Sequence, residues 1–126
     1  MNLHEQNEQT LIPALLSPGE KIHVMHLRRF EKDVRRHFVG EVESYEQGVA
    51  RASGYVFAID DLSKHLFVKR PDRRTKLIPV MSGDVIVNVI PDTVDLEQVA
   101  YELKDRSLVV TDGGAWTMDV KEFGWG

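Results

Sequence analysis

Two clusters of basic residues are the part of this sequence best suited to chemistry. One lies between residues 28 and 36, and the other between residues 69 and 76. The candidate binding residues are Arg28, Arg29, Arg35, Arg36, Lys69, Arg70, Arg73, Arg74 and Lys76. The planar fork of arginine suits phosphate oxygens. If both clusters reach one surface, that surface could follow a nucleic-acid backbone without reading sequence, and Tyr45, Tyr55 or Phe67 could stack on bases.

The charge distribution along the chain allows two interpretations. The net charge is −4, yet residues 21–76 carry thirteen of the sixteen Lys and Arg against eight acids, and residues 77–126 carry three bases against nine acids. This asymmetry is typical of nucleic-acid contact, but a solvated surface with chance clustering also produces it. It is equally typical of self-assembly. Basic residues of one subunit would then meet acidic residues of the next, with Arg70, Arg73 and Arg74 against Asp92, Asp95 or Asp105.

Catalytic motifs find little support in the sequence. The chain has no cysteine, no glycine-rich phosphate loop and no nucleophile elbow. His23 and His26 are three apart in a predicted strand, so they face opposite sides, and a shared metal ion is not expected. An enzyme would need a deep polar pocket, for which His26, Asn88 and Glu41 are the candidates. We therefore expect no enzyme, no cofactor and no metal site.

A long β-hairpin over residues 37–60 organises the chain. Along each half of this hairpin, successive side chains alternate between two faces. A turn signal at Gln47-Gly48 separates the two halves. In the second half one row contains only small residues and valine, against which large side chains can pack closely. Gly40 and Gly54 lie in mid-strand, where glycine usually marks a bulge or a bend. Long, bent strands of this kind are typical of a small barrel.

The remaining segments are predicted to be short strands and one basic loop. Strands are expected over residues 21–30, 65–69, 77–81 and 85–90, with a loop over residues 70–76 because Pro71 forbids a central strand there. Residues 94–104 fit a helix or a strand equally well. Further on, alternating apolar residues around Asp112-Gly113-Gly114 favour a meander from Val99 to Val120.

Laid out in this way, the chain resembles the Sm-like small barrels. Gly40, inside HFVGEVESYE, and the stretch VMSGDVIVNVI carry the resemblance. It implies a helix followed by five bent antiparallel strands, over residues 10–17, 21–30, 36–45, 48–60, 64–81 and 84–91. It also implies ring assembly and RNA binding. The family's turn begins with Arg where this chain has Ser82, and Gln47 is a poor match to its base-reading Asn, so the ring carries over better than the RNA pocket.

Together these features predict a mostly β protein, a small bent-strand antiparallel barrel of Sm-like or SH3-like type. We expect an N-terminal helix or arm over residues 1–20, the barrel over 21–91 and a C-terminal β-hairpin appendage over 92–126. The expected function is non-catalytic binding of RNA or single-stranded nucleic acid by a homo-oligomer. The alternative is a structural or protein-interaction module that forms a homo-oligomer without nucleic acid. No apolar run is long enough to span a membrane, and a cytoplasmic location is expected.

Overall fold

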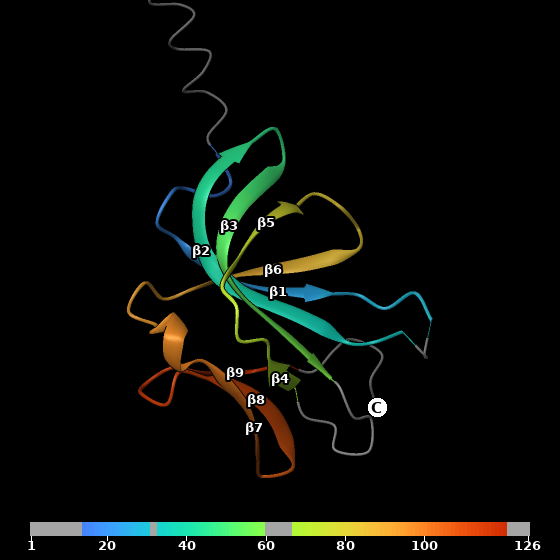
Figure 1. Ribbon diagram of the computed structural model, residues 1–126, viewed down its shortest axis with the longest axis vertical. Helices are drawn as coiled ribbons and strands as arrows, with labels where there is room; N and C mark the ends of the chain where they lie inside the picture. The colour runs from blue at the N-terminus through green and yellow to red at the C-terminus, as the bar shows by residue number, and fades with distance from the viewer. Residues whose placement is uncertain (1–13, 31–32, 60–66, 121–126) are drawn as a thin grey trace, which may run out of the picture.

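The computed structural model describes residues 14–30, 33–59 and 67–120 and shows a mostly β protein, whose regular elements there are antiparallel strands and one short 3-10 turn (Figure 1). In chain order the elements are β1 (Lys21–His26), β2 (Arg36–Glu46), β3 (Val49–Ile59), β4 (Phe67–Lys69), β5 (Arg74–Pro79), β6 (Val85–Ile90), the 3-10 turn η1 (Leu96–Gln98), β7 (Ala100–Lys104), β8 (Ser107–Thr111) and β9 (Thr117–Asp119). In the described part of the chain, no helix is long and apolar enough to cross a membrane.

The larger sheet is strongly curved but open. Its strands follow the order β4-β3-β2-β1-β6, and β5 pairs with the other half of β3. Strands β5 and β6 do not pair with each other, so the prediction of a closed barrel was wrong. Hydrophobic alternation indicates which residues form strands and which face they share, but it carries no signal for the edge hydrogen bonds that close a barrel.

The predicted hairpin is present as β2 and β3, and it forms the middle of this sheet. Its turn places Gln47 at φ 49° and Gly48 at φ 83°, the left-handed pair that tight hairpins require. Gly40 and Gly54 pair directly across the two strands. A Cβ atom on Gly54 would lie only 2.0 Å from the Val39 carbonyl oxygen, so the two backbones approach closely here. The β-bulge lies a little further along β2, where the register shifts between Val42 and Ser44.

One face of the curved sheet encloses a hydrophobic cluster, and we call it the inner face. Its buried residues come from β1, β2, β3, β5 and the segment before β1: Leu16, Ile22, Val24, Phe38, Val42, Ala50, Ala52, Val56 and Ile78. Val85 and Val87 of β6 pack against the same cluster. Because β5 and β6 both reach this cluster, the sheet curls around it even though its edges remain apart. The predicted small-residue row of β3 supplies the space for the larger side chains.

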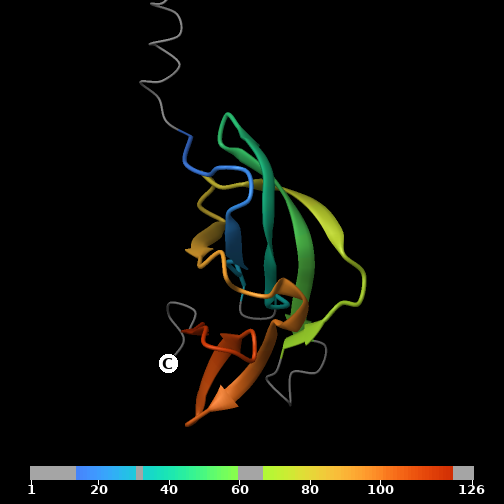
Figure 2. The ribbon, with the colours of Figure 1, turned by 90° about the vertical axis from the view of Figure 1, so that its left-hand side faces the viewer.

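The opposite face packs against a second, three-stranded sheet of order β7-β8-β9 (Figure 2). A shared cluster joins the two sheets and includes Phe57, Phe67, Tyr101 and Val110. The meander predicted between Val99 and Val120 is therefore present. The ambiguity over residues 94–104 resolves into a short 3-10 turn followed by a strand. Val94 and Leu96 around η1 are buried in the shared cluster, which anchors this segment to the larger sheet.

Two local predictions differ from the structure. The N-terminal helix expected over residues 10–17 lies mostly outside the described residues, and residues 14–20 form bends and a turn. Backbone hydrogen bonds from Gly19 to Val42 and from Val42 to Glu20 hold this segment against β2 instead. The predicted fourth strand over residues 64–81 is two strands, β4 and β5, because Pro71 interrupts pairing between them.

The basic loop is also shorter than predicted. It ends at Arg73, since Arg74 and Lys76 are residues of β5. Pro71 prevents strand pairing only in its own neighbourhood, and the alternation of Arg74, Lys76 and Ile78 places all three on one face. Two cations are therefore held at fixed positions on a strand rather than in a loop.

Candidate nucleic-acid interface

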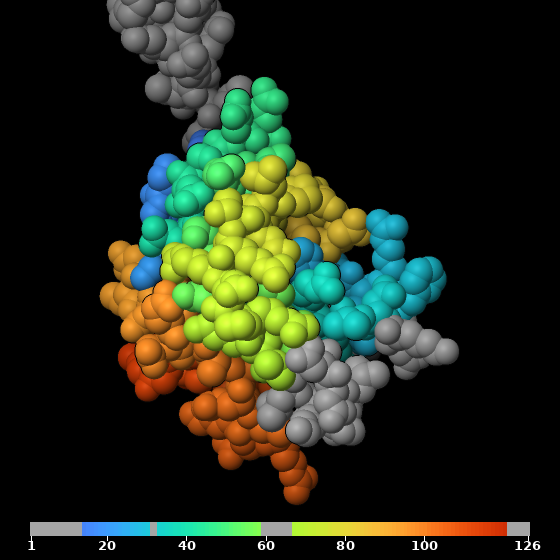
Figure 3. All heavy atoms as spheres, viewed as in Figure 1, coloured from blue at the N-terminus to red at the C-terminus, as the bar shows by residue number. Residues whose placement is uncertain are grey.

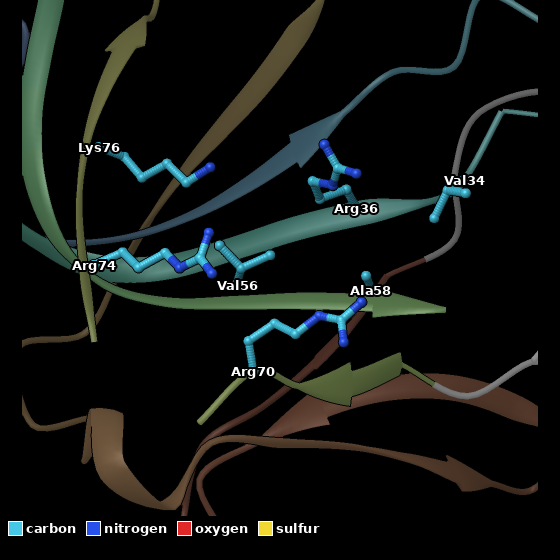
Figure 4. Close-up of a pocket in the computed structure, with 7 residues that line it drawn as sticks. All are labelled: Val34, Arg36, Val56, Ala58, Arg70, Arg74 and Lys76. Carbon is cyan, nitrogen blue, oxygen red and sulfur yellow. The ribbon is translucent and has the colours of Figure 1, made fainter. Parts of the chain in front are cut away.

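Four of the nine predicted binding residues converge on one depression, which we call the cationic hollow. It has a volume of about 570 Å³ and is lined by Val34, Arg36, Val56, Ala58, Arg70, Arg74 and Lys76. Figure 4 shows the side chains of Arg36, Arg74 and Lys76 extending over the strands towards a common space, which Arg70 also lines. None of the described residues that line it is acidic. The structure thus brings part of each basic cluster to the same place.

Strand register explains why these cations meet. Arg36 pairs with Ala58, Arg74 with Gly54, and Lys76 with Ala52, so all three lie beside small residues of β3 on the same face of the sheet. Arg70 joins them through a backbone hydrogen bond from its N–H to the Val56 carbonyl. On the face shown in Figure 3, the yellow segment that leads into β5 lies beside the cyan segment that leads into β2. Segments far apart in the sequence are therefore neighbours on this surface.

The hollow is a continuation of the inner face. Along β2 the next inner residue after Arg36 is Phe38, and along β5 the next after Lys76 is Ile78; both are fully buried in the core. Beyond the end of the hydrophobic core, the inner-face positions of β2 and β5 are thus occupied by charged residues. This pattern closes the hollow towards the middle of the sheet, and the described residues leave its other side open, with Val56 and Ala58 as an apolar floor.

The described residues that line the hollow give it a positive electrostatic environment. Burial, together with Arg36 and Arg74, lowers the pKa of the Lys76 ammonium. Burial, then Lys76, Arg36 and His37, also lowers the pKa of His26, which pairs with Arg36 across β1 and β2. Among the described residues, Arg36, Arg74 and Lys76 have no ion-pair partner. An anion in the hollow would therefore gain from charges that the described protein residues leave uncompensated.

Arg73 and Lys69 are engaged on the other face of the sheet. Arg73 Nη1 lies 3.0 Å from Glu97 Oε1, and its Nε donates to Ser53 Oγ at 2.8 Å. Lys69 Nζ donates to the Glu97 carbonyl at 2.9 Å and lies 4.1 Å from the centre of the Tyr55 ring. The hydrogen bond from the Tyr55 hydroxyl lowers the pKa of Glu97 and raises that of Tyr55. These contacts attach η1 to the larger sheet.

The other three predicted cations also lie outside the hollow lining. Arg29 forms an exposed ion pair with Asp84 at 3.1 Å. Arg35 is buried, with only 8% of its surface exposed, and Arg28 is half-buried. These three residues lie between β1 and β2, outside the regular strands. Strand alternation therefore could not predict where their side chains point.

The predicted stacking rings are not available at the surface. Phe67 and Tyr55 are buried, and Lys69 covers the Tyr55 ring. Tyr45 is half-buried against the inner cluster. The cationic hollow therefore offers charge and an apolar floor, without an aromatic platform among its described lining residues.

The structure contains a buried polar network that the sequence does not predict. His23 Nε2 lies 2.9 Å from the Tyr101 hydroxyl, which lies 2.7 Å from His37 Nδ1, and the two histidine nitrogens are 3.2 Å apart. Asn88 Nδ2 donates to His23 Nδ1 at 3.4 Å, which places the proton of neutral His23 on Nε2. His23 then donates to Tyr101, and Tyr101 donates to His37. The network joins residues of β1, β2 and β7, which are far apart in the sequence. It becomes apparent only when the second sheet is packed on the first.

The three residues considered for an enzyme do not share a pocket. His26 lies on the opposite face of β1 from His23, and Asn88 contacts His23. Glu41 pairs with Lys21 at the far end of β1 from His26. Among the described residues, no group of three or more His, Asp or Glu side chains is placed to hold a metal ion.

Comparisons of the chain with protein-family models, curated proteins and solved structures found no match, so the geometry of the site is the basis for the function considered next.

Proposed function

We propose that the protein binds RNA or single-stranded nucleic acid through the cationic hollow, without catalysing a reaction. The observation that carries this proposal is the convergence of Arg36, Arg70, Arg74 and Lys76 around one depression with no acidic residue in its described lining. Arginine forks and a lysine ammonium are suited to phosphate oxygens. An apolar floor without stacking rings supports contact with the backbone rather than readout of the bases.

The proposal predicts salt-dependent binding. A single-stranded RNA oligomer, labelled for fluorescence anisotropy, should bind with an affinity that falls steeply as salt rises, because bound phosphates release counterions. In Arg74→Gln/Lys76→Gln the affinity should fall by about a hundredfold, since each lost charged hydrogen bond is worth about tenfold. The slope of log affinity against log salt should also become shallower by about 1.4, or about 0.7 for each lost phosphate contact.

The matched control removes the same amount of charge elsewhere. Arg51 forms an exposed ion pair with Glu43, and Lys104 is exposed at the end of β7. Arg51→Ala/Lys104→Ala should retain the affinity and the salt slope of the unaltered protein to within about twofold. Equal loss of binding in both double variants would refute the hollow as the site and indicate a response to net charge alone.

A second candidate function is self-association, as a structural or protein-interaction module. The observation that favours it is the open sheet: β5 pairs only with β3, and β6 only with β1, among the described strands. Leu77 of β5 and Val89 of β6 are 66% and 56% exposed. Open strand edges beside exposed apolar side chains are typical places for another copy to add.

Self-association would be detected by light scattering coupled to size-exclusion chromatography. The expected result is a mass that is a multiple of 14.4 kDa and that falls in Leu77→Lys/Val89→Lys, which places charge on both edges. Leu15, which is exposed in the segment before β1 and belongs to no strand edge, offers a control, since Leu15→Lys should leave the mass unchanged. A monomer at every concentration tested would rule this candidate out.

A further inference from the structure

The cationic hollow differs from the surface expected for an internal stretch of nucleic-acid backbone. Three segments contribute four cationic side chains to one volume of about 570 Å³. The chain as a whole carries a net charge of −4, so this concentration is local. Like charges at this spacing repel one another, and burial, followed by Arg36 and Arg74, lowers the pKa of Lys76. A ligand that relieves the repulsion must bring several negative charges into one small space.

Charge density separates the ends of a nucleic acid from its interior. An internal phosphodiester carries one negative charge. A terminal phosphate monoester carries about 1.5 to 2 negative charges at neutral pH and offers three strong acceptor oxygens. A terminal diphosphate or triphosphate carries more. Four converging cations therefore match a terminal group better than an internal one.

The shape of the hollow also favours the end of a nucleic-acid chain over an internal stretch. Buried Phe38 and Ile78 close it towards the middle of the sheet, so a strand cannot continue along the inner face. A chain end can enter from the open side. Its phosphate would lie among Arg36, Arg74 and Lys76, and the attached sugar would rest on Val56 and Ala58. Val34, which is 52% exposed at the rim, supplies a further apolar contact.

We infer that the hollow binds a terminal phosphate or oligophosphate carried by a nucleoside, at the end of a nucleic-acid strand. This inference rests on the proposed function and names the part of the ligand that the site holds. A free nucleotide presents the same chemistry, so the test must distinguish the two sources.

The test compares four RNA oligomers of one sequence with an internal label: unphosphorylated, 5′-monophosphorylated, 5′-triphosphorylated and 3′-phosphorylated. At least one phosphorylated form should bind about tenfold or more tightly than the unphosphorylated form, because the terminal group adds charge and acceptors. The preference should disappear in Arg74→Gln/Lys76→Gln and remain in Arg51→Ala/Lys104→Ala. Calorimetry with a nucleoside triphosphate and with inorganic triphosphate measures the free ligands.

Each outcome separates the inference from the function on which it rests. Equal binding of all four oligomers, still reduced by Arg74→Gln/Lys76→Gln, overturns the inference and leaves nucleic-acid binding intact. Binding of a nucleoside triphosphate alone, lost in the same variant, overturns nucleic-acid binding and assigns the terminal phosphate to a free nucleotide. Absence of binding to every probe at low salt overturns both.

Discussion

Gly54→Ala is expected to lower the free energy of unfolding by about 3 kcal/mol or more, since overpacking against a rigid backbone is among the most destabilising of single changes. The new Cβ atom would lie 2.0 Å from the Val39 carbonyl oxygen and 2.4 Å from Gly40 Cα. Both are backbone atoms of β2, so no side-chain rotation can relieve the clash. The two central strands would have to separate at the point where Gly40 and Gly54 pair.

Urea unfolding followed by circular dichroism measures this effect. Gly83→Ala is the matched control, because nothing lies within 4 Å of a Cβ atom placed there and the residue has no positive φ. Its unfolding free energy should stay within about 0.5 kcal/mol of the unaltered protein. If Gly54→Ala proves as stable as Gly83→Ala, the close approach of β2 and β3 described above is wrong.

The second large effect is a loss of stability in mild acid. Burial, and then the neighbouring His37, lowers the pKa of His23 from its usual 6.5 to about 3. The unfolded chain therefore binds a proton on His23 between about pH 6.5 and pH 3, where the folded protein does not. Stability should fall as the pH falls through that window, by up to about 1.4 kcal/mol for each pH unit, and His23 alone contributes about 2 kcal/mol between pH 7 and pH 5.

Urea unfolding at pH 7 and at pH 5 tests this expectation. The difference in unfolding free energy between pH 7 and pH 5 should be smaller by about 2 kcal/mol in His23→Gln, because glutamine at position 23 does not titrate. This holds whatever the stability of that variant at pH 7. His26→Gln, on the same strand but the opposite face, should keep the larger part of the pH dependence. Measurement at pH 5 stays above the usual pKa values of the carboxylates, which titrate at lower pH. Identical pH dependence in His23→Gln and the unaltered protein would contradict a buried neutral His23.

The sequence is sufficient to predict the strands and their faces where alternation is regular. In β3 the small row at Ala52, Gly54 and Ala58 was predicted to accommodate large side chains, and in the structure its cross-strand partners are Lys76, Arg74 and Arg36. The β2–β3 turn and the C-terminal meander were also predicted, because glycine-containing turn signals and period-two patterns are local features. Barrel closure was not predictable, since it depends on hydrogen bonds between edges distant in sequence.

The candidate site was only partly predictable for the same reason. Arg73 and Arg74 are identical in type and adjacent in sequence, yet one pairs with Glu97 and the other lines the hollow. Composition cannot separate them, although strand alternation from Ile78 back to Arg74 does once β5 is known. The His23–Tyr101–His37 network needed the packing of the second sheet on the first, to which no sequence pattern pointed.

The most direct measurement of the central claim compares Arg74→Gln with Arg73→Gln in anisotropy titrations of single-stranded RNA at low salt. Each variant removes one positive charge from neighbouring positions of the same segment. The hollow predicts about a tenfold loss of affinity in Arg74→Gln and less than about a twofold change in Arg73→Gln. Equal losses in the two variants, or no binding by the unaltered protein, would contradict the assignment of the cationic hollow as a nucleic-acid site.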